Sequence, residues 1–200
     1  MILSDRGIRE ALRKHEITID PAPEDDQYTT SAVDLVLGGI FQAWSKNISI
    51  PGQKVELDLS STKFLDIAAA HLVDVAVSTV NEVEVTPLAD GGVILGPKQF
   101  LLGVTREEIS LRKTARLAAR VEGRSSLARL GLMVHLTAPI IHAGYHGHIT
   151  LEMINHGPFH LKLVPDKIRI CQLVFERLET SPHRSITGQF VGHTKPSGRR

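Results

Sequence analysis

Short apolar or alternating runs, separated by turn residues, dominate the sequence from residue 31 onward. Glycine, proline, aspartate and asparagine stand between the runs, as they do between β-strands. Many short strands with frequent turns are typical of a single mainly β domain, such as a barrel or a jelly roll. The runs that carry this prediction are AVDLVLG (32–38), KVELDLS (54–60), NEVEVTP (81–87), GVILGP (92–97) and HLKLVP (160–165).

Helical spacing is confined to short segments. Residues 4–15, SDRGIREALRKH, begin with a Ser-Asp cap signal and place apolar residues one turn apart, so we expect a short amphipathic helix. TREEISL (105–111) predicts one further helical turn, and residues 125–130 predict another. The expected fold is therefore mainly β, a distorted jelly roll with a short N-terminal helix and one or two other short helices.

One predicted strand, GYHGHITLEMIN (144–155), places a carboxylate on its polar face. Side chains alternate between the two faces of a strand, so Glu152 shares a face with His146, His148 and Thr150. Glutamate is a poor strand former, and a carboxylate in mid-strand lies either on a solvated face or in a pocket that uses its charge. From the residues alone both interpretations stay open.

The same strand face also suggests a metal site. His146, His148 and Glu152 form the pattern HxHxxxE, with which cupin-like jelly rolls hold a divalent metal ion. A second motif with a third histidine ligand is not found, and no glycine stands at the expected distance after Glu152. Scattered surface histidines are the simpler interpretation, and the cupin-like metal site is kept as an alternative.

The segment GRSSLARLG (123–131) gathers two arginines and two serines around a predicted turn that enters a short helix. Free backbone N–H groups, hydroxyls and guanidinium groups converge there on one small volume, which suits a phosphate group. Arginine offers paired donors to phosphate oxygens, and serine hydroxyls add further donors without bulk. The alternative is an ordinary surface helix that Ser125 caps, with its arginines in water.

The composition narrows the classes of function. The 200 residues are 42% hydrophobic, which is enough for one sizeable core. With 23 basic and 22 acidic residues, the net charge is close to zero, and no overall electrostatic field attracts nucleic acid or a membrane. Neither partner is therefore expected. Cys171 is the lone cysteine, which excludes a disulfide framework and a cysteine-rich zinc site. Without a secretion signal or a transmembrane run, we expect a cytoplasmic protein.

Five segments resemble the dCTP deaminase and dUTPase superfamily, and most of all its dCTP deaminase branch. Their order and spacing hold from the first helix to about Leu178, and the motif around GRSSLARLG is specific. The segments are TSAVDLVLGGIF (30–41), PKQFLLGVTREEISL (97–111), ARVEGRSSLARLGLMVH (119–135), TAPIIHAGYHGHITLEMIN (137–155) and VPDKIRICQLVFERL (164–178).

The resemblance implies a dUTPase-like barrel of the β-clip type and a homotrimer with active sites between neighbouring subunits. It implies one domain over residues 1–178 and a flexible C-terminal tail over 179–200 that closes over the nucleotide. The implied substrate is dCTP, with Mg²⁺ held mostly by the triphosphate and by water. By the same resemblance, dTTP is a candidate inhibitor.

Carried over position by position, the resemblance assigns Glu152 as the catalytic acid/base, assisted by Arg129 and Ser125. Most cytosine deaminases activate water with zinc held by a histidine and two cysteines. This branch does without zinc and uses the glutamate, a Ser-Arg pair and a backbone carbonyl, here near Ala138. The nucleotide-binding residues that it implies are Arg124, Ser125, Ser126, Leu127, Ala128, Arg129, Ala138, His142, Thr150, Leu151, Glu152, Gln172 and Gln189.

Position 142 departs from the superfamily, which usually carries Ile-Asp where this chain has Ile141 and His142. In the dUTP diphosphatases that aspartate helps to activate the water that attacks the α-phosphate. An imidazole does not replace a carboxylate in that role, although it can still hydrogen-bond a sugar hydroxyl. We therefore expect deamination of dCTP to dUTP, which supplies dUMP and dTTP synthesis, with negligible hydrolysis of dUTP. The alternatives are a dUTP diphosphatase or bifunctional enzyme on the same fold, and a catalytically silent nucleotide binder.

Overall fold

The chain begins with helix α1 (Asp5–Arg13), and the predicted N-terminal helix is thus confirmed. Ser4 caps it, because its hydroxyl accepts a hydrogen bond from the N–H of Gly7 at 3.4 Å. Ile8 is fully buried and holds the helix against the rest of the domain. The computed structural model describes residues 1–49, 55–184 and 195–196.

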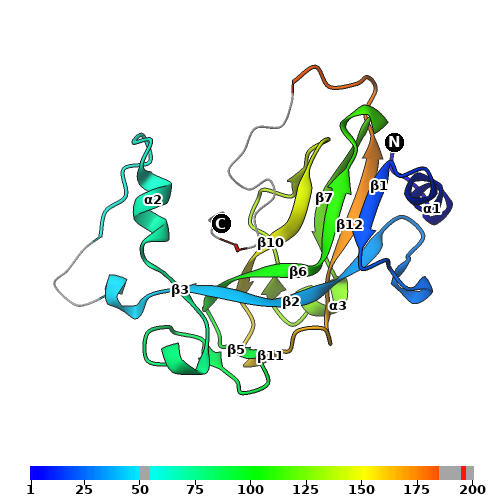
Figure 1. Cartoon of the computed structure of the whole chain (residues 1–200). Helices are drawn as coiled ribbons and strands as arrows, with labels where there is room; N and C mark the ends of the chain where they lie inside the picture. Colours follow the sequence, from blue (N-terminus) through cyan, green and yellow to red (C-terminus); the bar gives the residue numbers. More distant parts are fainter. Residues whose placement is uncertain (50–54, 185–194, 197–200) are drawn as a thin grey trace.

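The described residues after α1 form strands and short helical segments, which follow one another as Figure 1 shows. The strands are β1 (Ile17–Asp20), β2 (Val33–Trp44), β3 (Leu72–Asp74), β4 (Thr86–Pro87), β5 (Val93–Leu95), β6 (Phe100–Leu111), β7 (Leu117–Gly123), β8 (Leu132–Met133), β9 (Ile140–Ile141), β10 (His146–Asn155), β11 (Leu161–Leu163) and β12 (Arg169–Arg177). The other helices are α2 (Phe64–Ala69) and α3 (Ser125–Ala128), with 3₁₀ turns at η1 (Asp25–Gln27), η2 (Lys46–Ser49), η3 (Val77–Thr79) and η4 (Lys113–Ala115). Among these helices, none is long and apolar enough to cross a membrane.

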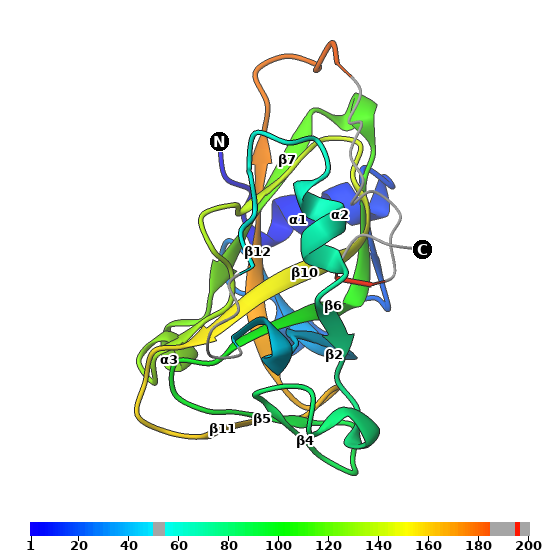
Figure 2. The same cartoon turned by 90° about the vertical axis from the view of Figure 1, so that its left-hand side faces the viewer.

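Most of the strands belong to one curled antiparallel sheet (Figures 1 and 2). Its strand order is β8-β10-β6-β2-β12-β7-β9, with β1 added on β6 and β3 added on β2. A smaller sheet has the order β11-β5-β4. The inward side chains of the curled sheet form the hydrophobic core, in which Phe175, Leu151 and Met153 are fully buried. The prediction of a mainly β domain with a few short helices is confirmed.

The prediction of a helical turn at TREEISL is wrong, because this segment is the second half of β6. Its residues alternate between buried and half-buried positions, as a strand paired with β10 and β1 requires. Glu107 is fully buried, and its carboxylate accepts the N–H of Val36 at 2.8 Å and pairs with Arg106 at 2.8 Å. Glutamates are good helix formers, but partners on neighbouring elements satisfy this one inside the sheet.

Two predicted strands between β2 and β5 are also corrected. Residues 55–60 of KVELDLS form no strand, since no strand among the described residues pairs with them, and Leu59 is 72% exposed. The segment NEVEVTP contributes only β4 and a single bridge between Val83 and Ser45. The same region contains α2, which the sequence did not predict. None of the residues of α2 is buried, and Figure 1 shows the helix apart from the curled sheet.

Two glycines allow the turn after α3 to lie directly on the turn after β10. Gly131 has a φ of +92°, a conformation that favours glycine, and its carbonyl accepts the N–H of His156 at 2.8 Å. A Cβ atom on Gly157 would lie only 1.9 Å from the carbonyl oxygen of Leu130. The close approach of these two backbones determines where α3 lies relative to β10.

We expect Gly157→Ala to destabilise the domain, since the added methyl group overlaps a backbone carbonyl that cannot rotate away. The free energy of unfolding should fall by about 2 kcal/mol or more, as for overpacked interior sites. Thermal unfolding measures this change. The matched control is Gly39→Ala, whose Cβ would lie 3.7 Å from the Pro165 side chain, and which should stay near the wild-type Tm. Equal Tm values for the two variants would contradict the close packing.

Candidate functional site

The segment 123–131 lies where β7 turns into α3. Arg124 occupies the N-cap position, and no side chain caps the helix, so Ser125 is not the cap that the surface-helix alternative requires. Ser125 and Ser126 are exposed, and within the described part of the chain their hydroxyls make no hydrogen bond. Arg129 is also exposed and forms no ion pair with any residue that the structure describes. These three side chains therefore remain available to a ligand or to another subunit.

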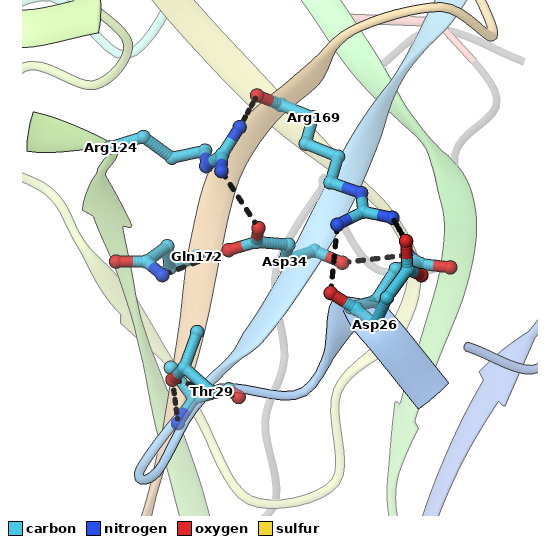
Figure 3. Close-up of polar contacts among 8 residues, drawn as sticks. Asp26, Thr29, Asp34, Arg124, Arg169 and Gln172 are labelled. Atoms are coloured by element: carbon cyan, nitrogen blue, oxygen red, sulfur yellow. Dashed lines mark hydrogen bonds and ion pairs between the residues drawn. The ribbon is translucent and has the colours of Figure 1, made fainter. Parts of the chain in front are cut away.

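The guanidinium group of Arg124, by contrast, is already engaged. Figure 3 shows it reaching toward β2 and β12, where Nη2 lies 3.1 Å from Oδ2 of Asp34 and Nη1 donates to the carbonyl of Arg169 at 3.1 Å. Gln172 donates from Nε2 to the other carboxylate oxygen of Asp34 at 2.8 Å. The fold thus brings two of the predicted nucleotide-binding residues together on one buried carboxylate.

Asp34 itself was not among the predicted site residues. It stands in the apolar run AVDLVLG, and a lone carboxylate inside such a run is the signal that could have found it. Leu127 is half-buried and packs against the core, whereas Ala128 is exposed. Within 123–131, the polar residues Ser125, Ser126 and Arg129 are thus exposed together with the apolar Leu130.

Glu152 lies in the middle of β10 on the half-buried face, as strand alternation predicts. Its Oε2 atom accepts the N–H of Leu136 at 3.2 Å. Burial raises the pKa of Glu152 above its ordinary value, while the Leu136 N–H and the nearby charge of His135 partly oppose that rise. A raised pKa makes the carboxyl group bind a proton more readily than an exposed glutamate does, which suits a group that has to take up and return a proton.

The loop whose Leu136 N–H binds the Glu152 carboxyl group has a strained backbone. Thr137 has a φ of +44°, in the left-handed region that β-branched residues rarely adopt. Such a residue costs about 1–3 kcal/mol, and strain of this kind concentrates at functional sites. Ala138, whose peptide is predicted to hold the reacting water, is exposed and follows Thr137 directly. Leu136, which donates its N–H to Glu152, directly precedes Thr137, so the carboxyl group is hydrogen-bonded to the main chain next to the strained residue.

The other predicted residues lie in different surroundings. Thr150 is half-buried on the same face as Glu152, whereas the side chain of Leu151 is fully buried, so only its main chain is available to a nucleotide. His142 is exposed after β9 and lines a cavity of about 600 Å³ with Arg120, Ile140, Glu176 and Arg184. Gln189 lies outside the described residues.

Within one chain the proposed catalytic groups do not meet. Across the described ranges 1–49, 55–184 and 195–196, no hydrogen bond or ion pair joins Glu152 to Arg129 or to Ser125. The described residues of one protomer therefore show no direct contact of this kind between the carboxyl group and the exposed Arg-Ser segment.

The histidines of the metal-site alternative are engaged elsewhere. Nε2 of His146 lies 2.8 Å from Oε1 of Glu108, and Nδ1 of His148 lies 3.0 Å from the carbonyl oxygen of Thr105. The register of β10 against β6 also shifts between His148 and Thr150. In the part of the chain that the structure describes, no group of three or more histidine, cysteine, aspartate or glutamate side chains is placed to hold a metal ion.

The curled antiparallel sheet thus carries an exposed Arg-Ser segment and a half-buried strand carboxyl group. The dCTP deaminase-like family matches residues 2–178, and the chain belongs to this family. The predicted family is thereby confirmed.

Relatives cover the chain almost completely. A "dCTP deaminase, dUMP-forming" of Methanothermobacter thermautotrophicus is 36% identical over 208 residues, which cover 100% of this chain and 93% of the relative. A protein of Persephonella marina with the same description is 38% identical, with 96% and 92% covered. A "dCTP deaminase" of Rhodospirillum rubrum is 40% identical, with 89% and 83% covered.

A solved structure shows the same fold. The 2'-deoxycytidine 5'-triphosphate deaminase of Agrobacterium tumefaciens aligns with a TM-score of 0.56 and 20% identity, over 87% of this chain. The alignment covers 47% of that protein, so this chain spans about half its length. The expected jelly-roll fold of the dCTP deaminase type is confirmed by this alignment.

Proposed function

We propose that this protein catalyses the zinc-independent hydrolytic deamination of dCTP to dUTP and ammonia. The observation that carries the proposal is Glu152, a half-buried carboxyl group with a raised pKa, held beside the strained peptide of Thr137 and Ala138. Hydrolytic deamination needs a base that activates water toward C4 of cytosine and an acid that protonates N3 and the departing ammonia. One carboxyl group can perform both steps in turn. The descriptions of the relatives from three organisms support dCTP as the substrate.

The second part of the proposal is a homotrimer whose active sites lie between subunits. Glu152 forms no ion pair with an arginine or a lysine among the described residues, while Arg129 is exposed without an acidic partner among them. Leu130, Met133 and Ile140 are large apolar side chains that stay 40–54% exposed, which suits a surface covered by a neighbouring subunit. Arg129 of one subunit would then keep Glu152 of the next one ionised and correctly oriented.

Magnesium is proposed to enter with the triphosphate. The described residues offer no cluster of acidic or histidine ligands for a metal ion, and Mg²⁺ binds readily to phosphate oxygens while it keeps several waters. Arg124 and Ser126 would therefore contact the phosphates rather than the metal ion. Magnesium would neutralise part of the triphosphate charge, and the deamination itself would be left to Glu152.

Four further proposals rest on the sequence. They are a domain over residues 1–178, a tail over 179–200 that closes over the triphosphate with Gln189, dTTP as a candidate inhibitor, and a cytoplasmic location. The location rests on Cys171, a lone cysteine that is fully buried.

The product separates two candidate functions. We propose dUTP, because His142 stands where a carboxylate would be needed for attack on the α-phosphate. The second candidate is a bifunctional enzyme that continues to dUMP, and it is favoured by the "dUMP-forming" descriptions of the Methanothermobacter and Persephonella relatives.

One assay tests these proposals together. Purified protein with dCTP and Mg²⁺ is expected to form dUTP and ammonia in equal amounts, without dUMP or pyrophosphate. A zinc chelator that spares Mg²⁺ should leave the rate unchanged. Formation of dUMP with pyrophosphate would establish the bifunctional candidate, and loss of activity that zinc restores would contradict zinc independence. If the protein binds dCTP but never converts it, the deaminase proposal fails and a silent binder remains.

The His142→Asp variant tests whether position 142 controls the product. If it does, this variant should form dUMP from dCTP.

A further inference from the structure

Asp34 is a carboxylate in the interior of the sheet. It lies on β2 between Val33 and Leu35, which are fully buried, and it is only 4% exposed itself. Burying an ionised carboxylate is strongly unfavourable unless other groups satisfy it. The contacts of Asp34 therefore explain why such a residue is tolerated at this position.

Both carboxylate oxygens of Asp34 are occupied by residues of the proposed nucleotide site. Oδ2 forms an ion pair with Nη2 of Arg124 at 3.1 Å, and Oδ1 accepts a hydrogen bond from Nε2 of Gln172 at 2.8 Å. Figure 3 shows the two side chains approaching Asp34 from β7 and β12. Gln172 stands directly opposite Asp34 in the pairing of β12 with β2, so strand register brings that partner into place. The main-chain carbonyl of Asp34 accepts Nε2 of Gln27 at 2.8 Å, which holds the strand from the other side.

Arg124 is held at a second point as well. Its Nη1 donates to the carbonyl of Arg169, and the guanidinium of Arg169 is in turn fixed by the carbonyl and the carboxylate of Asp26. The main-chain carbonyl of Arg124 accepts the N–H groups of Leu127 and Ala128, which makes Arg124 the first anchor of α3. Restraining this side chain thus restrains the start of the segment that carries Ser125 and Ser126.

We propose that Asp34 is a positioning residue of the nucleotide site, which acts by holding Arg124 and Gln172 in their binding geometry; this inference rests on the proposed function. Asp34 is too deeply buried to touch the nucleotide directly, and no hydrogen bond or ion pair in the described residues connects it to Glu152. Its effect is therefore on the affinity for the triphosphate rather than on the chemical step. Side chains that are ordered before the nucleotide arrives lose less conformational entropy on binding.

The test is a comparison of Asp34→Asn with the wild type in steady-state dCTP deamination. Asparagine keeps the shape of the side chain but loses the charge that orients Arg124. We expect the KM for dCTP to rise about tenfold, while kcat stays within about threefold, as for the loss of one charge-assisted hydrogen bond that acts on binding. The matched control is Asp25→Asn, which removes an exposed ion pair with Arg9 outside this network and should leave both constants near wild type.

A double-mutant cycle separates positioning from simple structural support. If Asp34 acts through Arg124, adding Asp34→Asn to Arg124→Gln should raise KM by less than about threefold beyond Arg124→Gln alone. The double variant carries no unpaired buried charge, so it keeps the test available even where Asp34→Asn alone does not fold. A tenfold additional rise in the double variant would mean that Asp34 acts independently of Arg124, and the inference would be overturned. The inference would also be overturned if Asp34→Asn left KM unchanged and lowered kcat only in proportion to the fraction of unfolded protein, because this result would indicate structural support alone.

Failure of the proposed function gives a different result. If the wild type does not convert dCTP, the deaminase proposal fails, and the role of Asp34 is read from the Kd for dCTP by calorimetry. The Kd should then be about tenfold higher in Asp34→Asn than in the wild type. Wild-type turnover with an unchanged KM in a folded Asp34→Asn variant would reject the Asp34 inference alone.

Discussion

Glu152→Gln is expected to lower the kcat for dCTP deamination by about 10²-fold or more, with the KM for dCTP nearly unchanged. Glutamine has the size of glutamate and can still accept the N–H of Leu136, so the loop at Thr137 should keep its conformation. What it lacks is a site that can take up and release a proton. Steady-state kinetics measure the effect, and calorimetry with dCTP verifies that binding is retained. Near-wild-type turnover by the glutamine variant would remove Glu152 from its assigned role.

The pH profile checks the same assignment. Because the ionised form of Glu152 has to act as the base, kcat/KM should fall as the pH drops through the pKa of this group. Burial raises that pKa, and the proposed contact with Arg129 of a neighbouring subunit would lower it, so the residual activity of Arg129→Ala should show the acidic limb at higher pH than the wild type. The limb should be absent from the residual activity of Glu152→Gln. An unchanged limb in that variant would assign the titration to another group.

Arg129→Ala is expected to abolish most of the deamination, mainly through kcat, since an arginine beside Glu152 affects the proton-transferring carboxyl group more than substrate binding. The Arg124→Ala variant is the contrast, because a residue that positions the phosphates should mainly raise KM. Should Arg129→Ala alter KM alone, its catalytic role would have to be dropped.

Mixed trimers test whether the two halves of the site come from different subunits. Subunits with Glu152→Gln and subunits with Arg129→Ala, co-expressed in equal amounts, should regain about one quarter of the wild-type activity per site. Each site takes Glu152 from one subunit and Arg129 from its neighbour. Under random assembly each of these two residues is wild type in about half of the sites, so about one quarter of the sites carry both. Each variant alone stays inactive, which provides the control. No recovery in trimers shown to be mixed would place both groups in the same subunit.

The local pattern of apolar and polar residues was sufficient to predict features that depend only on the element in which a residue lies. The face on which Glu152 lies followed from simple alternation, because side chains of a strand point to opposite sides whatever its neighbours are. The N-terminal helix followed in the same way from its cap and its apolar spacing.

Patterning failed where neighbouring elements decide the outcome. The glutamates of TREEISL favour a helix in isolation, but β6 has pairing strands on both sides and a backbone N–H that satisfies Glu107. Residues 55–60 alternate like a strand and yet form none, because no strand in the described part of the chain pairs with them to complete the hydrogen bonds.

The sequence by itself determined the mainly β class, the family and the identities of the residues proposed to bind and deaminate the nucleotide. These follow from short-range periodicity and from motifs whose chemistry resides in the residue types. Only the tertiary structure decided that Arg124 is paired with the buried Asp34 while Arg129 stays unpaired among the described residues. Both arginines stand in one motif and look equivalent in the sequence, and their difference arises because β2 and β12 approach one of them and not the other.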